Sequence, residues 1–192
     1  MRISLAGWVL LGVAAVLSSP RSEAQGYDPR PGRPGVVLEA AGEFGGDNVV
    51  KVFYRNGDTQ DIRAGQGVTL SVGAHYQPVS LPVDFAATVG YKFVTTSDYH
   101  TDLGIYRVVL KFTGTYALPN HFWVDAGPVV HTGTRLNGDG YVPDIDFDTS
   151  VGATVGAGWR WIGVTYTNMH YHSALTGDVD ASNIGATFTW KF

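Results

Sequence analysis

The feature that most constrains the fold of this chain is an alternation of apolar and polar residues with a period of two. In residues 83–94 (VDFAATVGYKFV), one face carries valine, phenylalanine and tyrosine, and the other carries aspartate, threonine, glycine and lysine. Successive side chains of a β-strand point to opposite sides, so this pattern predicts a strand between an apolar and a polar environment. Eight segments show this pattern, and none has a helical period: 36–45, 67–78, 82–95, 105–118, 121–135, 148–160, 161–173 and 183–192.

The connections between these segments alternate between short and long. The short ones lie at 79–82, 119–120 and Trp161, and the long, polar ones at 46–66, 96–104, 136–147 and 174–182. In the first long connection, segments 49–54 and 59–63 flank Asn56-Gly57, a dipeptide that favours a tight hairpin turn. We therefore expect an additional small hairpin there.

One proline interrupts the strand pattern. Pro128 lies inside the segment 121–135. Because proline has no backbone N–H to donate and a closed barrel has no free edge, we expect a β-bulge at this position.

Composition and residue placement narrow the class of protein. The 192 residues include no cysteine, which excludes disulfide frameworks and thiolate metal sites. The net charge of −4 does not favour binding to nucleic acid, which typically requires an excess of basic residues. The polar face of the segments is rich in small residues, and aromatic residues lie near the segment ends on the apolar face, as in membrane barrels. We expect an all-β fold over residues 36–192, an eight-stranded antiparallel up-and-down transmembrane β-barrel with a small extracellular hairpin in its first long loop.

The last segment gives the most specific signal. Its aromatic residues Phe188, Trp190 and Phe192 alternate with small and polar residues. This pattern resembles the terminal strand of bacterial outer-membrane barrels, which the barrel-assembly machinery recognises. Residues 56–67, 166–169 and 180–183 resemble a group of uncharacterised proteobacterial outer-membrane β-barrel proteins. The resemblance implies a place in the outer membrane of a Gram-negative cell, in contact with lipid and lipopolysaccharide, and no established activity.

The first residues predict export. Residues 1–24 resemble a secretory signal peptide, with Arg2, an apolar run at 5–17 and small residues before a cleavage point after Ala24. The apolar run is shorter than the about 20 residues that a membrane-spanning helix requires. Residues 25–35 are rich in proline and glycine and are expected to form an irregular periplasmic leader.

The strand phases place charged residues of both signs on the face that would line the barrel lumen. The acids are Glu39, Glu43, Asp84 and Asp125, and the bases are Lys92, Arg107, Lys111 and Arg160. An unpaired buried charge is costly, so we expect these residues to form a salt-bridge network that fills a narrow lumen, with Lys92 facing Asp84 or Glu43. A gate or polar conduit is the alternative.

A histidine and serine motif raises the question of catalysis. Lipid A deacylases resemble this chain in size and architecture, and they use a His-x-Ser arrangement, whereas here His170, His172 and Ser173 follow a different spacing. On a strand, His172 and Ser173 would face opposite sides, which disfavours a nucleophile and base pair. The two histidines also lack identified further metal ligands.

A second motif resembles a calcium loop. Asp144, Asp146 and Asp148 have suitable spacing, but Thr149 and Val155 stand where the loop requires glycine and glutamate. We therefore expect no enzymatic activity, no cofactor and no metal.

These observations favour a monomeric, non-enzymatic outer-membrane barrel with a structural or surface-interaction, adhesion-like role. A narrow, porin-like channel or transporter for small or apolar solutes is the alternative. A lipid A-modifying enzyme is the third hypothesis. The sequence identifies no physiological ligand.

Overall fold

The computed structural model describes residues 31–53, 59–98, 101–140 and 142–192. The expected signal peptide (1–24), most of the leader (25–35) and the Asn56-Gly57 turn lie outside these residues. The described residues form strands and one short 3-10 turn, η1 (Pro119–His121). Among them, no helix has the length and apolar character needed to cross a membrane.

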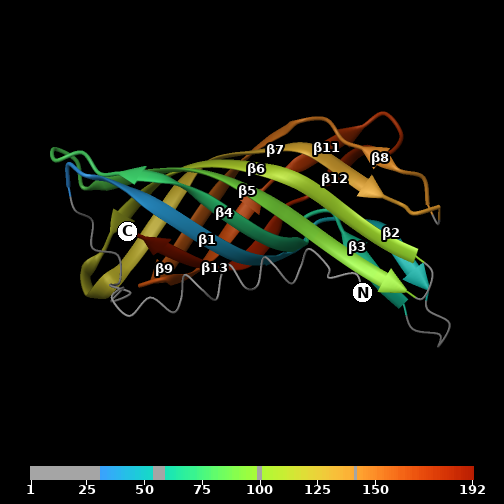
Figure 1. Ribbon diagram of the computed structural model, residues 1–192, viewed down its shortest axis with the longest axis horizontal. Helices are drawn as coiled ribbons and strands as arrows, with labels where there is room; N and C mark the ends of the chain where they lie inside the picture. Colours follow the sequence, from blue (N-terminus) through green and yellow to red (C-terminus); the bar gives the residue numbers. More distant parts are fainter. Residues whose placement is uncertain (1–30, 54–58, 99–100, 141) are drawn as a thin grey trace, which may run out of the picture.

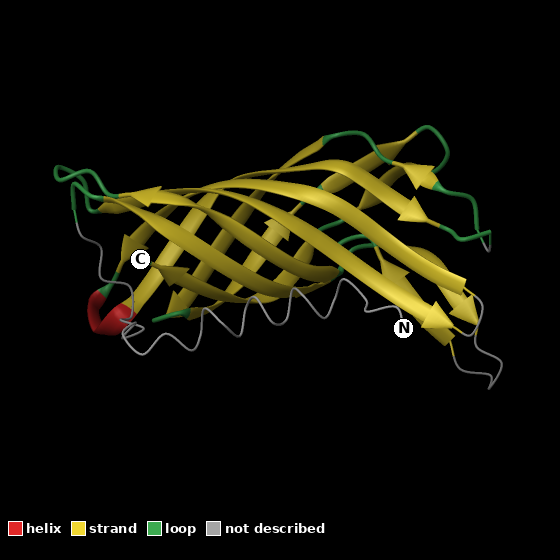
Figure 2. Ribbon diagram, in the orientation of Figure 1, coloured by secondary structure: helices red, strands yellow, loops and turns green. Residues whose placement is uncertain are grey.

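Eight antiparallel strands close into a barrel (Figures 1 and 2). They are β1 (Pro34–Phe44), β4 (Gly67–Tyr76), β5 (Val83–Asp98), β6 (Thr101–Ala117), β7 (Phe122–Asn137), β9 (Ser150–Trp159), β10 (Ile162–Asn168) and β13 (Asn183–Lys191). Each pairs with the next in this order, and β13 pairs with β1 to complete the ring. The expected closed barrel is thus confirmed.

The remaining strands lie at one end of the barrel. They are β2 (Asn48–Phe53) and β3 (Thr59–Arg63), which pair as the expected hairpin, β8 (Ile145–Asp146), which pairs with the last residues of β7, and β11 (His170–Ser173) and β12 (Gly177–Asp180), which form a second hairpin. We call this the long-loop end. The opposite, short-turn end carries the connections at 77–82, 118–121 and 160–161.

One expected strand is divided. The segment 161–173 was predicted as a single strand, but β10 ends at Asn168 and β11 begins at His170. Met169 between them accepts through its main-chain oxygen from the backbone N–H of Ala181 (2.9 Å), which joins the two arms of the second hairpin at its base. The alternation continues through Met169, so the break left no mark in the periodicity.

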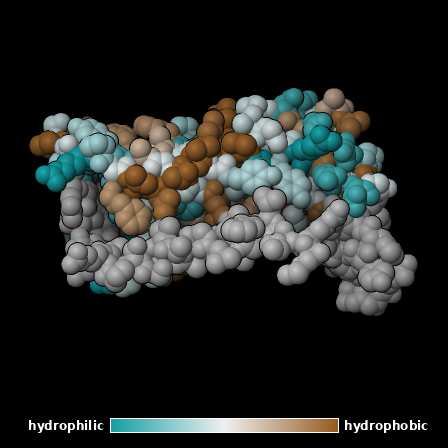
Figure 3. All heavy atoms as spheres, in the orientation of Figure 1, coloured by the Kyte–Doolittle hydropathy of each residue, from teal (hydrophilic) through white to brown (hydrophobic). Residues whose placement is uncertain are grey.

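The apolar face of the barrel strands points outward. On β5, the side chains of Val89 and Tyr91 are about half exposed, whereas Thr88 and Lys92 are buried. The same holds around the ring for the exposed aliphatic residues Val68, Val72, Leu110, Val151, Val155, Val164 and Ile184. Figure 3 shows hydrophobic residues over the barrel wall and hydrophilic ones gathered toward the long-loop end. The polarity of the barrel is therefore the reverse of that of a water-soluble core.

The prediction of a bulge at Pro128 is wrong. The pairs Lys111↔Val129 and Gly114↔Ala126 share one register on either side of it. The register shift between β6 and β7 instead lies where Gly133 and Thr134 face the single residue Arg107, and Gly133 has a φ of 58°. Glycine adopts this conformation without strain, which suits an inserted residue, whereas proline removes one donor without requiring an extra residue.

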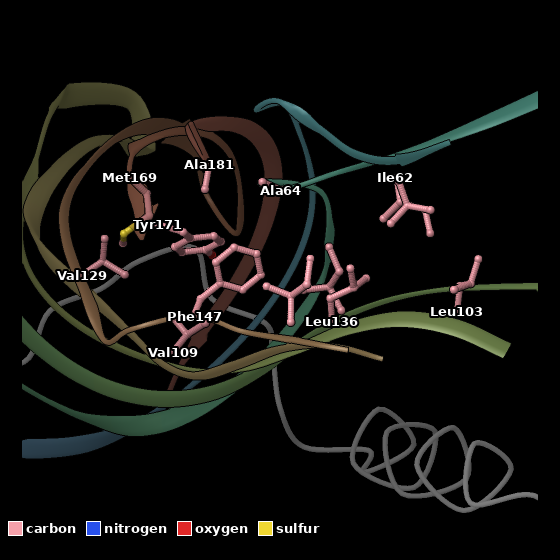
Figure 4. Close-up of a cluster of buried hydrophobic side chains, with 13 residues drawn as sticks. Ile62, Ala64, Leu103, Val109, Val129, Leu136, Phe147, Met169, Tyr171 and Ala181 are labelled. Atoms are coloured by element: carbon pink, nitrogen blue, oxygen red, sulfur yellow. The ribbon is translucent and has the colours of Figure 1, made fainter. Parts of the chain in front are cut away.

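A hydrophobic core fills the long-loop end (Figure 4). Its buried members are Val50, Ile62, Ala64, Leu103, Ile105, Val109, Val129, Leu136, Ile145, Phe147, Met169, Tyr171 and Ala181. Figure 4 shows Phe147, Tyr171 and Met169 enclosed by curved strands. We call this core, with the long loops that cover it (45–53, 59–66, 138–140, 142–149 and 169–182), the cap.

Candidate functional site

The charged interior of the barrel begins directly beneath the cap. The Nζ atom of Lys92 (β5) lies 3.1 Å from a carboxylate oxygen of Glu43 (β1), which also accepts from the hydroxyl of Thr69 (β4). Lys92 donates in addition to the main-chain oxygen of Gly65 at 2.8 Å. This ion pair therefore links the barrel wall to the first long loop.

Arg107 makes the second link between the barrel and this loop. Its guanidinium donates to the main-chain oxygens of Ala64 and Gln66, each at 2.6 Å, and lies 5.6 Å from the ring centroid of Tyr171. Within the described ranges it forms no ion pair, and its Nε atom is buried without a hydrogen-bond partner. Two buried cations thus hold three consecutive carbonyl groups of the loop.

A small polar cavity lies below this layer. Its volume is about 30 Å³, and its walls include Glu39, Glu43, Lys111, His131, Thr69, Thr154, Thr165, Thr167 and Thr187. About 10–15 Å³ is enough for one water molecule where polar partners are present, so this cavity has room for about two. The hydroxyl of Thr187 is buried without a hydrogen-bond partner in the described structure.

Beside the cavity, Lys111 (β6) donates to both carboxylate oxygens of Glu39 (β1) at 2.5 Å. Asp125 (β7) lies in the same region of the lumen, and its Oδ1 atom is buried without a hydrogen-bond partner among the described residues. This middle part of the lumen therefore contains the ion pair between Lys111 and Glu39 and one acid, Asp125, with an oxygen atom that lacks a hydrogen-bond partner in the described structure.

A third charged group lies near the short-turn end. Asp84 (β5) is fully buried between Nζ of Lys191 (β13) at 2.7 Å and Nδ1 of His75 (β4) at 3.1 Å. Lys191 also donates to the hydroxyl of Thr115 at 3.2 Å. These contacts connect four strands across the lumen.

The structure brings most of the predicted lumen residues together. Glu39 pairs with Lys111 and Glu43 with Lys92, and Asp84, Arg107 and Asp125 also lie inside. Of the two partners considered for Lys92, the structure selects Glu43. Asp84 pairs with Lys191 and His75, which sequence reasoning left out of the network, although both lie on the polar face of their strands.

The assignment of Arg160 to the lumen is wrong. Strand β9 ends at Trp159, and Arg160 is an exposed turn residue with a φ of 53°. Its guanidinium lies 4.5 Å from the ring centroid of Trp159, outside the barrel. Side chains alternate between the lumen and the outer wall only within the strand. Because Arg160 lies one residue beyond the end of β9, extending the alternation to it wrongly predicts that its side chain faces the lumen.

The histidine and serine motif lies on the β11–β12 hairpin of the cap. His172 is exposed, and its Nδ1 lies 2.8 Å from a carboxylate oxygen of Asp178. Ser173 is buried on the opposite face, and its hydroxyl accepts from the backbone N–H of Leu175 at 3.3 Å. Among the residues that the structure describes, no histidine or acidic side chain forms a hydrogen bond with the Ser173 hydroxyl.

Two of the three aspartates of the calcium-like motif, Asp144 and Asp146, lie beside Arg135. Asp144 accepts from Arg135 at 2.8 Å and from the backbone of Gly138 at 2.9 Å, and both bonds hold the pKa of this exposed carboxyl below its usual range. Asp146 lies 3.7 Å from Arg135. In the described part of the chain, no group of three or more histidine, cysteine or acidic side chains is arranged to hold a metal ion.

Aromatic residues form two groups on the outer wall. Near the short-turn end are Tyr76, Tyr116, Phe122, Trp159, Trp161, Phe188 and Trp190, and toward the long-loop end are Phe44, Tyr91, Phe93, Tyr106 and Tyr166. Trp161 stacks on Phe188 and Trp190 with centroid distances of 5.5 and 6.4 Å. Of the residues expected to signal assembly, Phe188 and Trp190 therefore join the first aromatic group, and Phe192 is exposed at the same end.

Comparisons with known proteins add no assignment. No protein-family model matches the chain, and no curated protein matches it at a significant level.

Proposed function

We propose that the chain spans the outer membrane of a Gram-negative cell as an up-and-down barrel, with the cap on the outside. In this proposal it is a monomeric, non-enzymatic protein with a structural or surface-interaction role. The observation that carries the proposal is a change of polarity, inside and outside the barrel, at the level of Tyr91, Phe93 and Tyr106.

The interior changes at this level along β6. Leu103 and Ile105 are buried in the cap core, whereas the next three inward positions are Arg107, Val109 and Lys111, two of which are charged. A core that is apolar inside suits a segment surrounded by water. A polar interior with an apolar outer face suits a segment surrounded by lipid.

The outer face changes in the opposite sense along β7. Phe122 and Val124 are exposed and apolar, whereas Arg135 and Asn137, beyond the bulge, are exposed and polar. Both faces therefore support a membrane boundary near the second aromatic group, and the closed barrel satisfies the backbone hydrogen bonds that lipid cannot satisfy.

The cap supports a surface role. Its core combines side chains from three long loops with side chains of β6 and β7, and Val94 of β5 packs against it. Lys92 and Arg107 fix the first loop from below. In this proposal the cap presents a fixed surface above the membrane, which contacts lipopolysaccharide or another cell-surface partner. The aromatic residues Phe188, Trp190 and Phe192 remain our candidates for recognition by the assembly machinery.

Membrane insertion can be tested on the full chain refolded into phosphatidylcholine vesicles. We expect a strand-dominated circular dichroism spectrum and different migration on SDS gels before and after boiling, because closed barrels resist detergent. A chain that stays monomeric and soluble without detergent or lipid would contradict the proposal.

Two further measurements separate the alternatives. In planar bilayers we expect no stable conductance, because the cap core fills the long-loop end, and steady conductance would replace our proposal with the channel hypothesis. We also expect the lipid A mass spectrum of cells to be independent of this protein. A change in acylation that requires Ser173 would establish the enzyme hypothesis instead.

A further inference from the structure

The β11–β12 hairpin presents two histidines and two aspartates on one face. His170 stands opposite Asp180, and His172 opposite Asp178. The alternate residue Tyr171 is buried in the cap core, which turns the histidines outward. Residues two apart on a strand are separated by about 7 Å, so the two imidazoles are neighbours on the surface.

The ring of His172 has a defined orientation. Its Nδ1 lies 2.8 Å from the carboxylate of Asp178, while its Nε2 makes no hydrogen bond to the described residues. Histidines that bind metals commonly donate one ring N–H to a carboxylate and coordinate through the other nitrogen. Both side chains are largely exposed, at 59% and 85%, where an ion pair contributes little to stability.

A third acid comes from the segment before β9. The backbone N–H of Asp148 donates to the main-chain oxygen of His172 at 2.9 Å. On the buried side of the same two segments, Phe147 packs against Tyr171 with a centroid distance of 5.6 Å. Since side chains alternate, the exposed Asp148 lies on the same side as His172.

We propose that His170 and His172 bind a divalent transition metal ion of the Zn²⁺ class on the surface of the cap. Water completes the coordination, Asp178 orients one imidazole, and Asp148 adds negative charge beside it. Imidazole nitrogen selects Zn²⁺, Ni²⁺ or Cu²⁺, whereas Ca²⁺ requires a set of six or more oxygen ligands. With two protein ligands, the ion exchanges with solvent, and this site does not depend on the proposed membrane location.

The test is a calorimetric titration of the full chain in detergent with Zn²⁺ at neutral pH. We expect about one ion per chain, and an affinity that falls as pH is lowered because protonated imidazoles do not bind metal. The double variant H170N/H172N should bind at least about tenfold more weakly, and D178N about 10-fold more weakly through loss of the orienting carboxylate. The matched control H121N changes an exposed histidine at the other end and should bind as the parent does.

Circular dichroism and gel migration before boiling verify that each variant is folded. Three results would overturn the site: no Zn²⁺ binding by the parent chain, undiminished binding by the folded double variant, or Ca²⁺ binding as tight as Zn²⁺ binding. The last result would indicate a site made by the aspartates alone.

Discussion

Arg107 donates from Nη1 to the main-chain oxygen of Ala64 at 2.6 Å and so joins a barrel strand to a loop 43 residues earlier. Its Nη2 reaches Gln66, and Lys92 reaches Gly65 between them. The buried cations are therefore directed at backbone carbonyls as well as at acids. This explains how a charged lumen and an apolar cap can meet within one barrel.

Replacing Arg107 with methionine should loosen the cap more than the barrel. Two buried carbonyl groups would lose charged donors, and hydrogen bonds of this kind contribute about 1.5–3 kcal/mol each. We expect faster amide hydrogen exchange in residues 59–66, with little change in the barrel strands. Arg160→Met removes an exposed guanidinium and is the control, and equal exchange in both variants would contradict the anchoring role.

Replacing Lys92 with methionine should destabilise the barrel by leaving the Glu43 carboxylate without its cation. Removing one member of a buried pair typically costs about 3–5 kcal/mol, and access to the nearby cavity would reduce this. Adding Glu43→Gln should recover part of the loss, whereas adding Asp84→Asn should not, because Asp84 pairs with Lys191. Urea unfolding in vesicles measures all three free energies.

The barrel could be predicted from the sequence because apolar and polar residues alternate with a period of two in each of its strands. The inward phase of Glu39, Lys92 and Lys111 follows directly from that period. The cap could not be predicted in the same way. Its core combines distant residues such as Ile62, Leu136 and Tyr171, and no local pattern shows that they meet.

The errors at the site have the same origin. Arg160 lies one residue beyond its strand, and periodicity does not show where a strand ends. Arg107 has the predicted phase, but its partners are backbone oxygens of a loop, which no side-chain pattern reveals. The lumen positions of His75 and Lys191 could have been predicted from the sequence, since both lie on the polar face of their strands, as Asp84 does.

Val155→Arg tests which solvent surrounds the barrel. Val155 is exposed on the outer wall in the middle of β9. If lipid surrounds it, an arginine near the membrane centre should cost about 2–4 kcal/mol, whereas Asn137→Arg beyond the second aromatic group should cost about 0–1 kcal/mol. The comparison uses unfolding in vesicles, and equal costs at both positions would favour an aqueous environment.

Acidification should release the second hairpin of the cap. Asp180 accepts from the backbone N–H of Ser182 at 2.8 Å, and the bonds from Ser182 hold the pKa of this carboxyl below its ordinary value of 3.8. Because the folded pKa is the lower one, the stabilisation is complete above pH 3.8 and is lost as the pH falls through the folded value. Amide exchange at Ser182, corrected for its intrinsic pH dependence, should therefore lose protection in this range. In Asp180→Asn, whose amide oxygen still accepts the bond without titrating, the protection should not change with pH. A loss of protection in that variant over the same pH range as in the parent would assign the transition to another group.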